Sequence, residues 1–488
     1  MLRIYFICII LSVFVLNTQA EIILPRILGH GMVLQRKKPV TIWGTASVGE
    51  QVSVTFGKQV KKTVADDSGK WAVILDPLKA SSVGASLIIK GSNTIQLNDI
   101  LVGEVWLCSG QSNMEFTMRK NSKMKSKIAE DQAKINELEH AKNPEIRIFL
   151  VNRKELIKPD PQHNKGWSIA RDSALRSFSA PGYFFAKELN EKLKVPVGMI
   201  SSAIPGSAIE PWIPENGFTS DYFKDKKISS DPGKFYKPMI EPLSPFALKG
   251  FLWYQGETNC FQNETIEYTY KMEALINSWR KLWNDRSLPF YYTQIAPYYY
   301  SKSTDKYPLT KETLPKFWEA QQAALKIPHT GMIVTTDLID SPDDLHPGYK
   351  WEVGRRLAQL PLANDYGLKL TPTGPLFKKM KLSGKKAKLS FSNTGGGLMC
   401  KDTKDVRGSK ILTQFEIAGS DGKYVPAIAE IKGKKILVSS AEVQRPENVR
   451  FSWNEGGKAN LYNRAGLPAM PFRTDNPLKN QFQPEKAK

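Results

Sequence analysis

Short runs of alternating hydrophobic and polar residues fill the part of the chain that follows residue 20. Six of these runs predict β-strands: VTIW, QVSVTF, VKKTVA, KWAVIL, ASLIIK and TIQL. The segments DDSG and KGSN lie between them and supply turn residues. Because short strands at regular spacing are typical of two packed sheets, we predict a small β-sandwich domain at residues 21–98.

From residue 99 to 366 the pattern changes to apolar strands that alternate with amphipathic helices. The predicted strands are DILVGEVWLC, IRIFLV, VPVGMISSA, ALKGFLWYQ, LPFYYTQIA and GMIVTT. Four stretches with apolar residues three and four apart predict the helices: KSKIAEDQAKINELEHA, SAPGYFFAKELNEKL, TIEYTYKMEALINSWRKLW and PKFWEAQQAALK. This alternation predicts an α/β fold with a mostly parallel sheet between two layers of helices. In such a sheet the active site forms at the carboxyl ends of the strands.

The short-strand pattern returns after residue 366. Five segments carry it: KAKLSFSN, LTQFEIAG, YVPAIAEI, KKILVSSA and ENVRFSW. We therefore predict a C-terminal β-rich domain and tail at residues 367–475, followed by a polar end at residues 476–488.

The first twenty residues, MLRIYFICIILSVFVLNTQA, have the layout of a secretory signal peptide. Arg3 precedes an apolar run, and Thr18 and Ala20 are small residues at its end. We expect residues 1–20 to be cleaved and the mature protein to be secreted, periplasmic or on the surface of a bacterial cell. An uncleaved anchor is the alternative, although the apolar run is short for a membrane span.

Composition and charge narrow the function classes only slightly. The formal net charge of +21 comes from lysines strewn over the 488 residues, as on the solvated faces of strands. No nucleic-acid-binding fold accompanies them, so we expect no nucleic acid partner, and a basic surface favours acidic glycans. Three cysteines follow the signal peptide, Cys108, Cys260 and Cys400. We expect buried thiols, and whether Cys108 pairs with Cys260 stays open.

A serine follows the predicted strand EVWLC, where an α/β sheet places its chemistry. Ser112 lies in VWLCSGQSNMEF, and both an ordinary turn and an exposed nucleophile explain this segment. A serine nucleophile needs a base, and the chain has five histidines: His30, His140, His163, His329 and His346. Among them, His346 lies on a polar loop behind two aspartates, in DDLHPGYKWEV.

Further strand ends carry groups that fit acyl transfer. Asp343 and Asp344 are both placed to orient the imidazole of His346, and helix capping is the alternative role. GFLWYQGETNC puts the amide of Asn259 at a strand end, where an oxyanion donor contributes about 3 kcal/mol; a Gly-Asn turn explains that segment equally well. MISSAIPGSAIEPW adds the backbone N–H of Gly206. Four strand ends with a nucleophile, oxyanion donors and a base favour chemistry over coincidental turns.

Motifs also resemble a known family over nearly the whole mature chain. GQSNM and WYQGETN are a specific pair, and MVLQRKKPVTIWG, DLHP, EVGRRLA and NLYNRAGLPAMPFRTD match as well. These motifs resemble the sialate O-acetylesterase family of carbohydrate esterases, within the SGNH hydrolases. The resemblance implies an SGNH-type three-layer domain with Ser112 as nucleophile and His346 as general base. It also implies an oxyanion hole formed by the Ser112 amide, Gly206 and Asn259.

By this resemblance, the protein removes acetyl groups from an O-acetylated glycan or sialoside through an acetyl-serine intermediate. It implies no metal or organic cofactor, and it leaves the oligomeric state open. The expected substrate-binding residues are Gln111, Gln255, Glu257 and Trp212.

Three positions depart from the family pattern or divide it. Pro205 stands where a glycine is usual, and because proline has no N–H, Gly206 is the one donor left in that pair. Trp318 replaces an arginine, which is expected to change the mouth of the pocket. The general pattern Asp-x-x-His selects Asp343 as the acid and the family pattern selects Asp344; we favour Asp343 on the wider pattern.

Two other functions stay open. Esterases that act on acetylated xylan resemble this family closely, and a fold alone does not choose the sugar. A non-catalytic glycan-binding protein would use exposed aromatic residues, for which Trp43, Trp71, Trp253 and Tyr254 are candidates. Such residues are more often part of the core.

Overall fold

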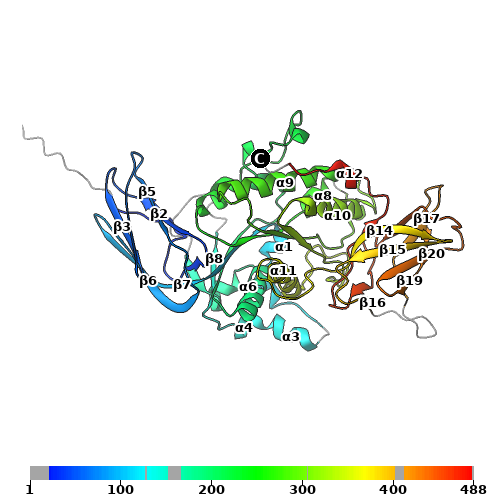
Figure 1. Ribbon diagram of the computed structural model, residues 1–488, viewed down its shortest axis with the longest axis horizontal. Helices are drawn as coiled ribbons and strands as arrows, with labels where there is room; N and C mark the ends of the chain where they lie inside the picture. The colour runs from blue at the N-terminus through cyan, green and yellow to red at the C-terminus, as the bar shows by residue number, and fades with distance from the viewer. Residues whose placement is uncertain (1–20, 127–128, 152–165, 305, 402–410, 486–488) are drawn as a thin grey trace, which may run out of the picture.

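The computed structural model describes residues 21–126, 129–151, 166–304, 306–401 and 411–485, so the predicted signal peptide at residues 1–20 lies outside the described residues. Figure 1 shows three regions side by side along the longest axis: an N-terminal β-region, a central α/β region and a C-terminal β-region. Within the described chain, no helix is long and apolar enough to cross a bilayer.

The central region is built on one sheet. Its strands, in spatial order, are β13 (Thr330–Ile333), β12 (Phe290–Thr293), β11 (Gly250–Tyr254), β7 (Thr94–Gly110), β10 (Val197–Ala203), β8 (Ile146–Leu150) and β9 (Trp167–Ile169). Neighbouring strands pair in parallel, except that β9 is antiparallel to β8. The α/β class and the mostly parallel sheet are therefore confirmed.

Helices cover both faces of this sheet (Figure 1). On one face lie α9 (Ile266–Leu282) and α10 (Thr313–Ala323), and on the other lie α6 (Ala180–Leu193) and α11 (Lys350–Asn364). The shorter helices are α1 (Ser112–Glu115), α2 (Met118–Asn121), α3 (Ala129–Ile135), α4 (Glu137–His140), α5 (Asp172–Arg176), α7 (Tyr236–Met239), α8 (Glu257–Phe261) and α12 (Leu478–Gln481). The helix predicted from KSKIAEDQAKINELEHA is two short helices, α3 and α4.

The N-terminal region is joined to the central sheet by one long strand. Its other strands are β1 (Val33–Gln35), β2 (Val40–Thr45), β3 (Gln51–Phe56), β4 (Gln59–Val64), β5 (Lys70–Leu75) and β6 (Ser81–Lys90). The first part of β7 pairs with β6 and the last part pairs with β10 and β11. The boundary predicted between residues 98 and 99 therefore falls inside β7, and the buried residues of both regions form one hydrophobic cluster.

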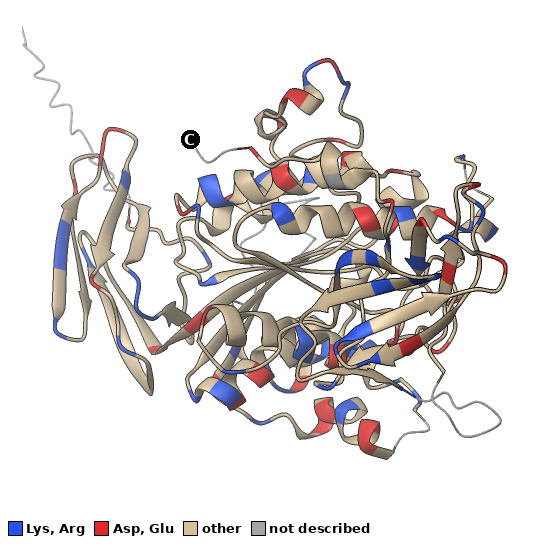
Figure 2. Cartoon of the chain, turned by 45° about the vertical axis from the view of Figure 1, so that its right-hand side comes forward, with Lys and Arg blue, Asp and Glu red and all other residues tan. Residues whose placement is uncertain are grey.

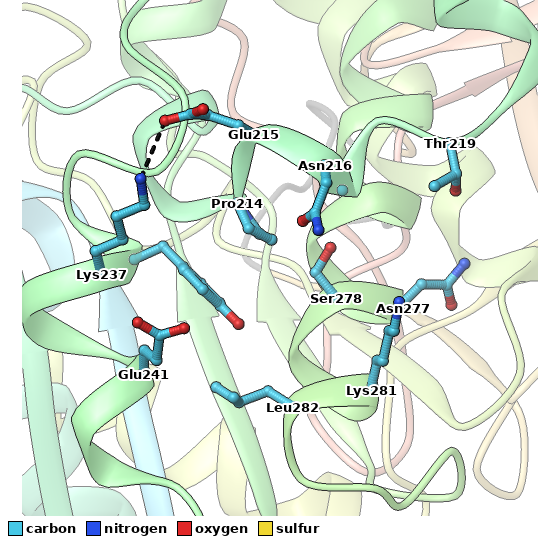
Figure 3. A pocket seen from close by; sticks show the side chains of 12 residues that line it. Pro214, Glu215, Asn216, Thr219, Lys237, Glu241, Asn277, Ser278, Lys281 and Leu282 are labelled. Carbon is cyan, nitrogen blue, oxygen red and sulfur yellow. Dashed lines mark hydrogen bonds and ion pairs between the residues drawn. The ribbon is translucent and has the colours of Figure 1, made fainter. Parts of the chain in front are cut away.

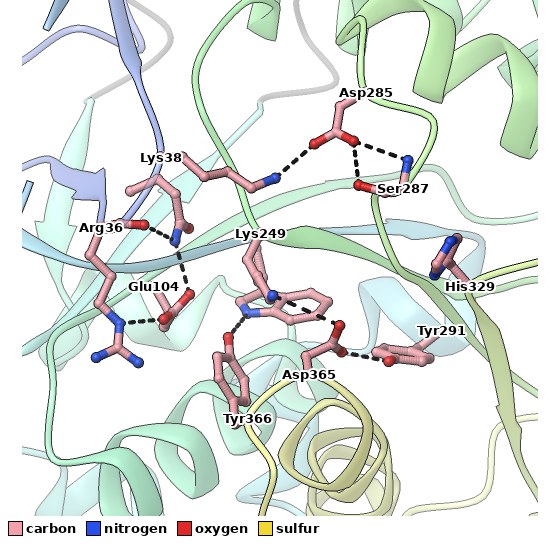
Figure 4. A network of polar contacts seen from close by, with 12 residues as sticks. Arg36, Lys38, Glu104, Lys249, Asp285, Ser287, Tyr291, His329, Asp365 and Tyr366 are labelled. Atoms are coloured by element: carbon pink, nitrogen blue, oxygen red, sulfur yellow. Dashed lines mark hydrogen bonds and ion pairs between the residues drawn. The ribbon is translucent and has the colours of Figure 1, made fainter. Parts of the chain in front are cut away.

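Polar contacts fix the two regions further, as Figure 4 shows at the amino-terminal side of the sheet. Arg36 forms an ion pair with Glu104 of β7, and Gln35 donates to the same carboxylate at 3.0 Å. Lys38 reaches Asp285 at 2.8 Å. These contacts tie the segment after β1 to β7 and to the chain after α9.

The C-terminal region has its own core. One sheet has the order β14 (Leu376–Ser383), β15 (Lys386–Ser392), β20 (Lys435–Ser439) and β19 (Ile428–Lys432); the other has the order β18 (Val425–Pro426), β17 (Phe415–Ala418), β21 (Asn448–Phe451) and β23 (Phe472–Arg473). A two-stranded sheet of β16 (Leu398–Cys400) and β22 (Leu461–Asn463) completes it. Its buried residues form a separate cluster.

The segment after residue 475 returns to the central region. Phe482, just beyond α12, is fully buried, and its backbone oxygen accepts a hydrogen bond from Lys326 at 2.7 Å. Tyr270 of α9 donates to the backbone oxygen of Gln481 at 3.0 Å. This end is therefore packed on α9 and on the segment that follows α10, although its composition is polar.

Lys and Arg residues occur in all three regions among Asp and Glu (Figure 2).

Candidate active site

Three strand ends converge on Ser112, the first residue of α1. β7 ends at Gly110, which has φ +139°. A Cβ atom added at this position would lie only 2.1 Å from the backbone oxygen of Tyr254. Only glycine allows this close approach to the end of β11. Gln111 donates its N–H to the same Tyr254 oxygen at 3.0 Å, and Ile204, after β10, donates to Gly110 at 3.0 Å. The nucleophile predicted from the sequence thus lies where the carboxyl ends of β7, β10 and β11 meet.

The structure brings Ser112 and His346 together. Nε2 of His346 lies 2.8 Å from Oγ of Ser112, a hydrogen-bonding distance between a base and a hydroxyl. Ser112 is 8% exposed, whereas His346 lies on an exposed part of the loop between β13 and α11. The ring is partly covered, and this partial burial lowers the pKa of His346 below 6.5; the positive charges of Lys350 and Lys120 lower it further. A neutral imidazole at pH 7 is able to accept the serine proton.

The two candidate acids occupy different environments. Asp343, the acid that the wider pattern favoured, is exposed and pairs with Lys302 at 2.7 Å. Asp344 accepts the backbone N–H of His346 at 2.8 Å, and its charge raises the pKa of the imidazole. Among the described residues, neither carboxylate is hydrogen-bonded to the imidazole ring. The contacts favour Asp344 over Asp343, whose carboxylate is paired with Lys302, and the choice between the two acids stays a prediction.

We call Ser112 and His346 the dyad. Two backbone N–H groups are available on the loops that border it. Gly206 has φ +71°, and its N–H has no hydrogen-bond partner within the described part of the chain; the same holds for the N–H of Ser112. Thr258 donates from its hydroxyl to the backbone oxygen of Gly206 at 3.2 Å, which holds the loop after β10 beside α8. Unpaired N–H groups at a strand end are the donors that an oxyanion needs.

The amide of Asn259 is not available in the same way. Its Nδ2 donates to Glu210 at 3.3 Å and to Glu264 at 3.2 Å, and its Oδ1 accepts from Ile209 and from Gln255. Both amide hydrogens are therefore used by protein groups, and the side chain is fully buried. In this arrangement Asn259 ties the loop after β10 to α8, and its role as an oxyanion donor stays a prediction.

Two of the expected substrate-binding residues lie in the core. Trp212 is fully buried and donates from its indole to Ser207 at 3.0 Å. Gln255 is fully buried, with its amide nitrogen bound to Ser207 and Asn259 and its amide oxygen bound to Tyr268. Neither side chain is exposed to solvent, so the expectation that they bind substrate is corrected for both.

The other two lie next to the dyad but are also nearly covered. Gln111 is 2% exposed and accepts the N–H of Gly256 at 3.2 Å. Glu257 is 2% exposed and accepts from Asn113 at 2.5 Å. Trp318, which was expected at the mouth of the pocket, is 2% exposed and donates to Ile295 at 2.8 Å, so it belongs to the core.

Sequence reasoning missed two residues that border the dyad, Asn113 and Lys350. Asn113 directly follows Ser112, and Lys350 lies four residues after His346, at the start of α11. Lys350 is 1% exposed, whereas the lysines of this sequence were interpreted as solvated. In the sequence, only the spacing of four residues between His346 and Lys350 indicated that Lys350 lies near the imidazole.

A separate surface pocket of about 650 Å³ lies between α7 and α9 (Figure 3). Polar side chains line it, among them Glu215, Lys237, Glu241, Asn277 and Lys281. Neither Ser112 nor His346 lines this pocket, so it is distinct from the dyad.

The described residues contain no group of three or more His, Cys, Asp or Glu side chains placed to hold a metal ion. Cys108 and Cys260 are separate buried thiols. Burial raises the pKa of Cys108 to about 12, which makes it a poor nucleophile.

Comparisons with known proteins agree with this geometry. A family model described as carbohydrate esterase, sialic acid-specific acetylesterase, matches residues 102–362. The sialate O-acetylesterase of Pongo abelii is 30% identical over an alignment of 498 positions that covers 91% of each chain. That of Homo sapiens is 30% identical over an alignment of 411 positions that covers 75% of each chain.

Among solved structures, a carbohydrate acetylesterase from Xanthomonas citri matches 93% of this chain and 100% of its own, with 35% identity and a TM-score of 0.80. The resemblance found in the sequence is confirmed. The chain is a carboxylic ester hydrolase and belongs to the sialic acid-specific acetylesterase family of carbohydrate esterases.

Proposed function

We propose that the protein is an exported serine esterase of the SGNH type that removes O-acetyl groups from O-acetylated sialic acids. The observation that carries this proposal is the 2.8 Å contact between Oγ of Ser112 and Nε2 of His346 at the carboxyl ends of three parallel strands. Export rests on the layout of residues 1–20, which lie outside the described residues.

In the first step, neutral His346 takes the hydroxyl proton of Ser112 while Oγ attacks the acetyl carbonyl. The negative charge then forms on the carbonyl oxygen, within reach of the N–H groups of Ser112 and Gly206. The bond to the sugar oxygen breaks, and His346 returns the proton to the leaving alcohol. Asp344 stabilises the imidazolium that exists between these two events.

In the second step, His346 takes a proton from water, which attacks the acetyl-serine carbonyl. The same two N–H groups hold the second oxyanion. The bond to Oγ breaks, Oγ regains its proton from His346, and acetic acid leaves. The overall reaction consumes one water molecule and produces the free sugar hydroxyl and acetic acid, which ionises to acetate and a proton at neutral pH.

An exposed cation near the dyad supports an acidic sugar. Lys120 of α2 has a side chain that is 49% exposed, and its charge lowers the pKa of His346. Its ion pair with Glu115 is long, at 3.4 Å, so its ammonium can also meet the carboxylate of a sialic acid. A neutral xylose unit has no group for this contact.

The test is acetate release from O-acetylated sialoglycoprotein and from acetylated xylan, measured side by side. We expect release from the sialoglycoprotein, and its loss in Ser112→Ala and in His346→Ala. Lys120→Met should raise KM several-fold for the sialate ester while kcat changes little.

Other outcomes reassign the function. Release from xylan alone names acetyl xylan as the substrate. If wild type and Ser112→Ala bind the glycan equally and neither releases acetate, the protein is a glycan-binding protein instead.

The assignment of the acid has its own pair of variants. Asp344→Asn should lower kcat by about tenfold or more, because the imidazolium loses its nearby negative charge. Asp343→Asn should stay within about threefold, because its carboxylate is paired with Lys302 at the surface. The reverse result would return the acid to Asp343.

A further inference from the structure

The dyad is underlain by three buried polar side chains, Glu257, Asn113 and Lys350, which we call the buried relay. Their exposed fractions are 2%, 0% and 1%. Asn113 lies between the other two: its Oδ1 accepts from Nζ of Lys350 at 2.7 Å, and its Nδ2 donates to Glu257 at 2.5 Å. The amide thus presents its oxygen to the amino group of Lys350 and its nitrogen to the carboxyl group of Glu257, whose pKa is raised by burial.

The buried relay is hydrogen-bonded to the loop that carries His346, which we call the histidine loop, at the residues on both sides of His346. Asn113 donates to the backbone oxygen of Leu345 at 3.1 Å, and Lys350 donates to the backbone oxygen of Pro347 at 2.6 Å. Asn113 also follows the nucleophile directly in the chain. One set of hydrogen bonds therefore fixes the serine helix and the histidine loop relative to each other.

Charge is the second contribution. Lys350 lies with its ammonium 5.0 Å from the ring centre of Phe116 and 5.4 Å from that of Tyr254. Burial lowers the pKa of Lys350 to about 7, against the opposing effects of Glu257 and Asp344. His346 takes up a proton only below pH 6.5, and Lys350 is mostly charged in that range. The positive charge of Lys350 therefore disfavours a second positive charge on the imidazole.

We propose that Lys350 is a positioning residue that holds His346 over Ser112 through the buried relay and places its charge beside the histidine loop. The proposal rests on the proposed role of His346 as base. The charged groups that face the imidazole are Lys350 from α11, Lys120 from α2 and Asp344 from the loop, and Glu257 from α8 faces Lys350. Lys120 acts in the same direction as Lys350, so the shift assigned to Lys350 is a partial one.

The test uses two neutral variants of the full chain. Lys350→Met removes the hydrogen bonds and the charge, whereas Lys350→Gln removes the charge and keeps an amide donor. The pKa of His346 is measured in each by NMR titration of ring-labelled histidine, with the signal assigned by His346→Asn. The pH profile of kcat/KM is measured in parallel, and Lys234→Met, a surface lysine that pairs with Asp231, is the matched control.

We expect the pKa of His346 to rise by about half a unit or more in both Lys350 variants and to stay unchanged in Lys234→Met. The acid limb of kcat/KM should move to higher pH by the same amount. At pH 8, Lys350→Met should lose about tenfold or more in kcat with less than a threefold change in KM, and Lys350→Gln should recover part of the loss.

Three results overturn the proposal. One is a His346 pKa at or above 6.5 in the wild type, which needs no variant. Another is an unchanged His346 pKa in a folded Lys350 variant. The third is a loss of kcat that follows loss of folded protein alone. The titration does not depend on activity, so a wild type without esterase activity would remove the proposed function and leave the electrostatic result readable.

Discussion

Replacing Arg473 with methionine tests how the C-terminal region is held to the central region. Nε and Nη2 of Arg473 donate to the two carboxylate oxygens of Glu319 on α10, at 2.9 and 3.0 Å. Glu319 is 2% exposed, so its charge depends on this partner. Burial raises the pKa of Glu319 and Arg473 lowers it, and both effects are present in the wild type.

The size of the loss follows from proton uptake. Without Arg473, the buried carboxylate of Glu319 would take up a proton on folding. The free energy of adding this proton at pH 7 is set by the ordinary pKa of 4.5 in the unfolded chain. This cost is about 2.5 units times ~1.36 kcal/mol, or about 3.4 kcal/mol. Because burial already raises the pKa in the wild type, part of this cost is present there. We therefore expect a loss of about 2–3 kcal/mol, near the range for broken buried pairs.

The sign of the pH dependence is fixed by the direction of the shift. A carboxyl group whose pKa is raised on folding destabilises the folded state above that pKa, and the effect disappears as the pH falls toward 4.5. At pH 5 the proton costs only about 0.7 kcal/mol by the same conversion. The deficit of Arg473→Met should therefore be much smaller at pH 5 than at pH 7.

The assay is urea unfolding at both pH values, followed by circular dichroism and by the fluorescence of Trp453 and other tryptophans. Arg450→Met is the control, because Arg450 pairs with the more exposed carboxylates of Glu416 and Glu312 and should cost under about 1 kcal/mol. Adding Glu319→Leu to Arg473→Met should restore most of the loss. A loss below about 0.5 kcal/mol at pH 7, or an equal loss at pH 5, would refute this reasoning.

Three further outcomes follow from the site and its surroundings. kcat/KM should remain high below pH 6.5 and fall only at the lowered pKa of His346, because the base must be neutral; a midpoint at or above 6.5 contradicts this. Gly256→Ala should lose most folded protein in a thermal melt, since φ is +147° and the new Cβ would lie 2.8 Å from Phe317, whereas Gly206→Ala, with open space around it, should cost only about 1–2 kcal/mol of backbone strain. Cys108 should react with a thiol reagent only after unfolding, and rapid labelling of the native protein would contradict its burial and its pKa of about 12.

Much of the fold was predictable because the periodicity of apolar residues reports burial directly. The strand β3 has Val52, Val54 and Phe56 inside, as its alternation indicates. The length of β7 was not predictable, because Asn98 and Asp99 are turn residues by type. Asp99 adopts φ +60° within the strand, and the paired register of β6 and β7 is irregular, so the chain continues where the local pattern predicts a turn.

At the site, the sequence could place Ser112 because it follows a predicted strand, and His346 because it lies on a polar loop behind two aspartates. It could not show that Asn259 is already fully hydrogen-bonded, since the partners that occupy its amide, Glu210 and Glu264, come from other segments. The choice between Asp343 and Asp344 depended in the same way on Lys302, which lies about forty residues away in the chain.

The long strand β7 makes the nucleophile part of the N-terminal region as well as of the central sheet. Residues 94–102 are paired with β6 and residues 104–110 with β10, and both regions share one hydrophobic cluster. A chain cut between residues 98 and 99 would break β7 within the stretch that pairs with β6 and leave both fragments with an open core. The N-terminal region is therefore not an exchangeable module, and we expect it to unfold cooperatively with the catalytic sheet, whereas the C-terminal region, with a separate core, can melt in a step of its own.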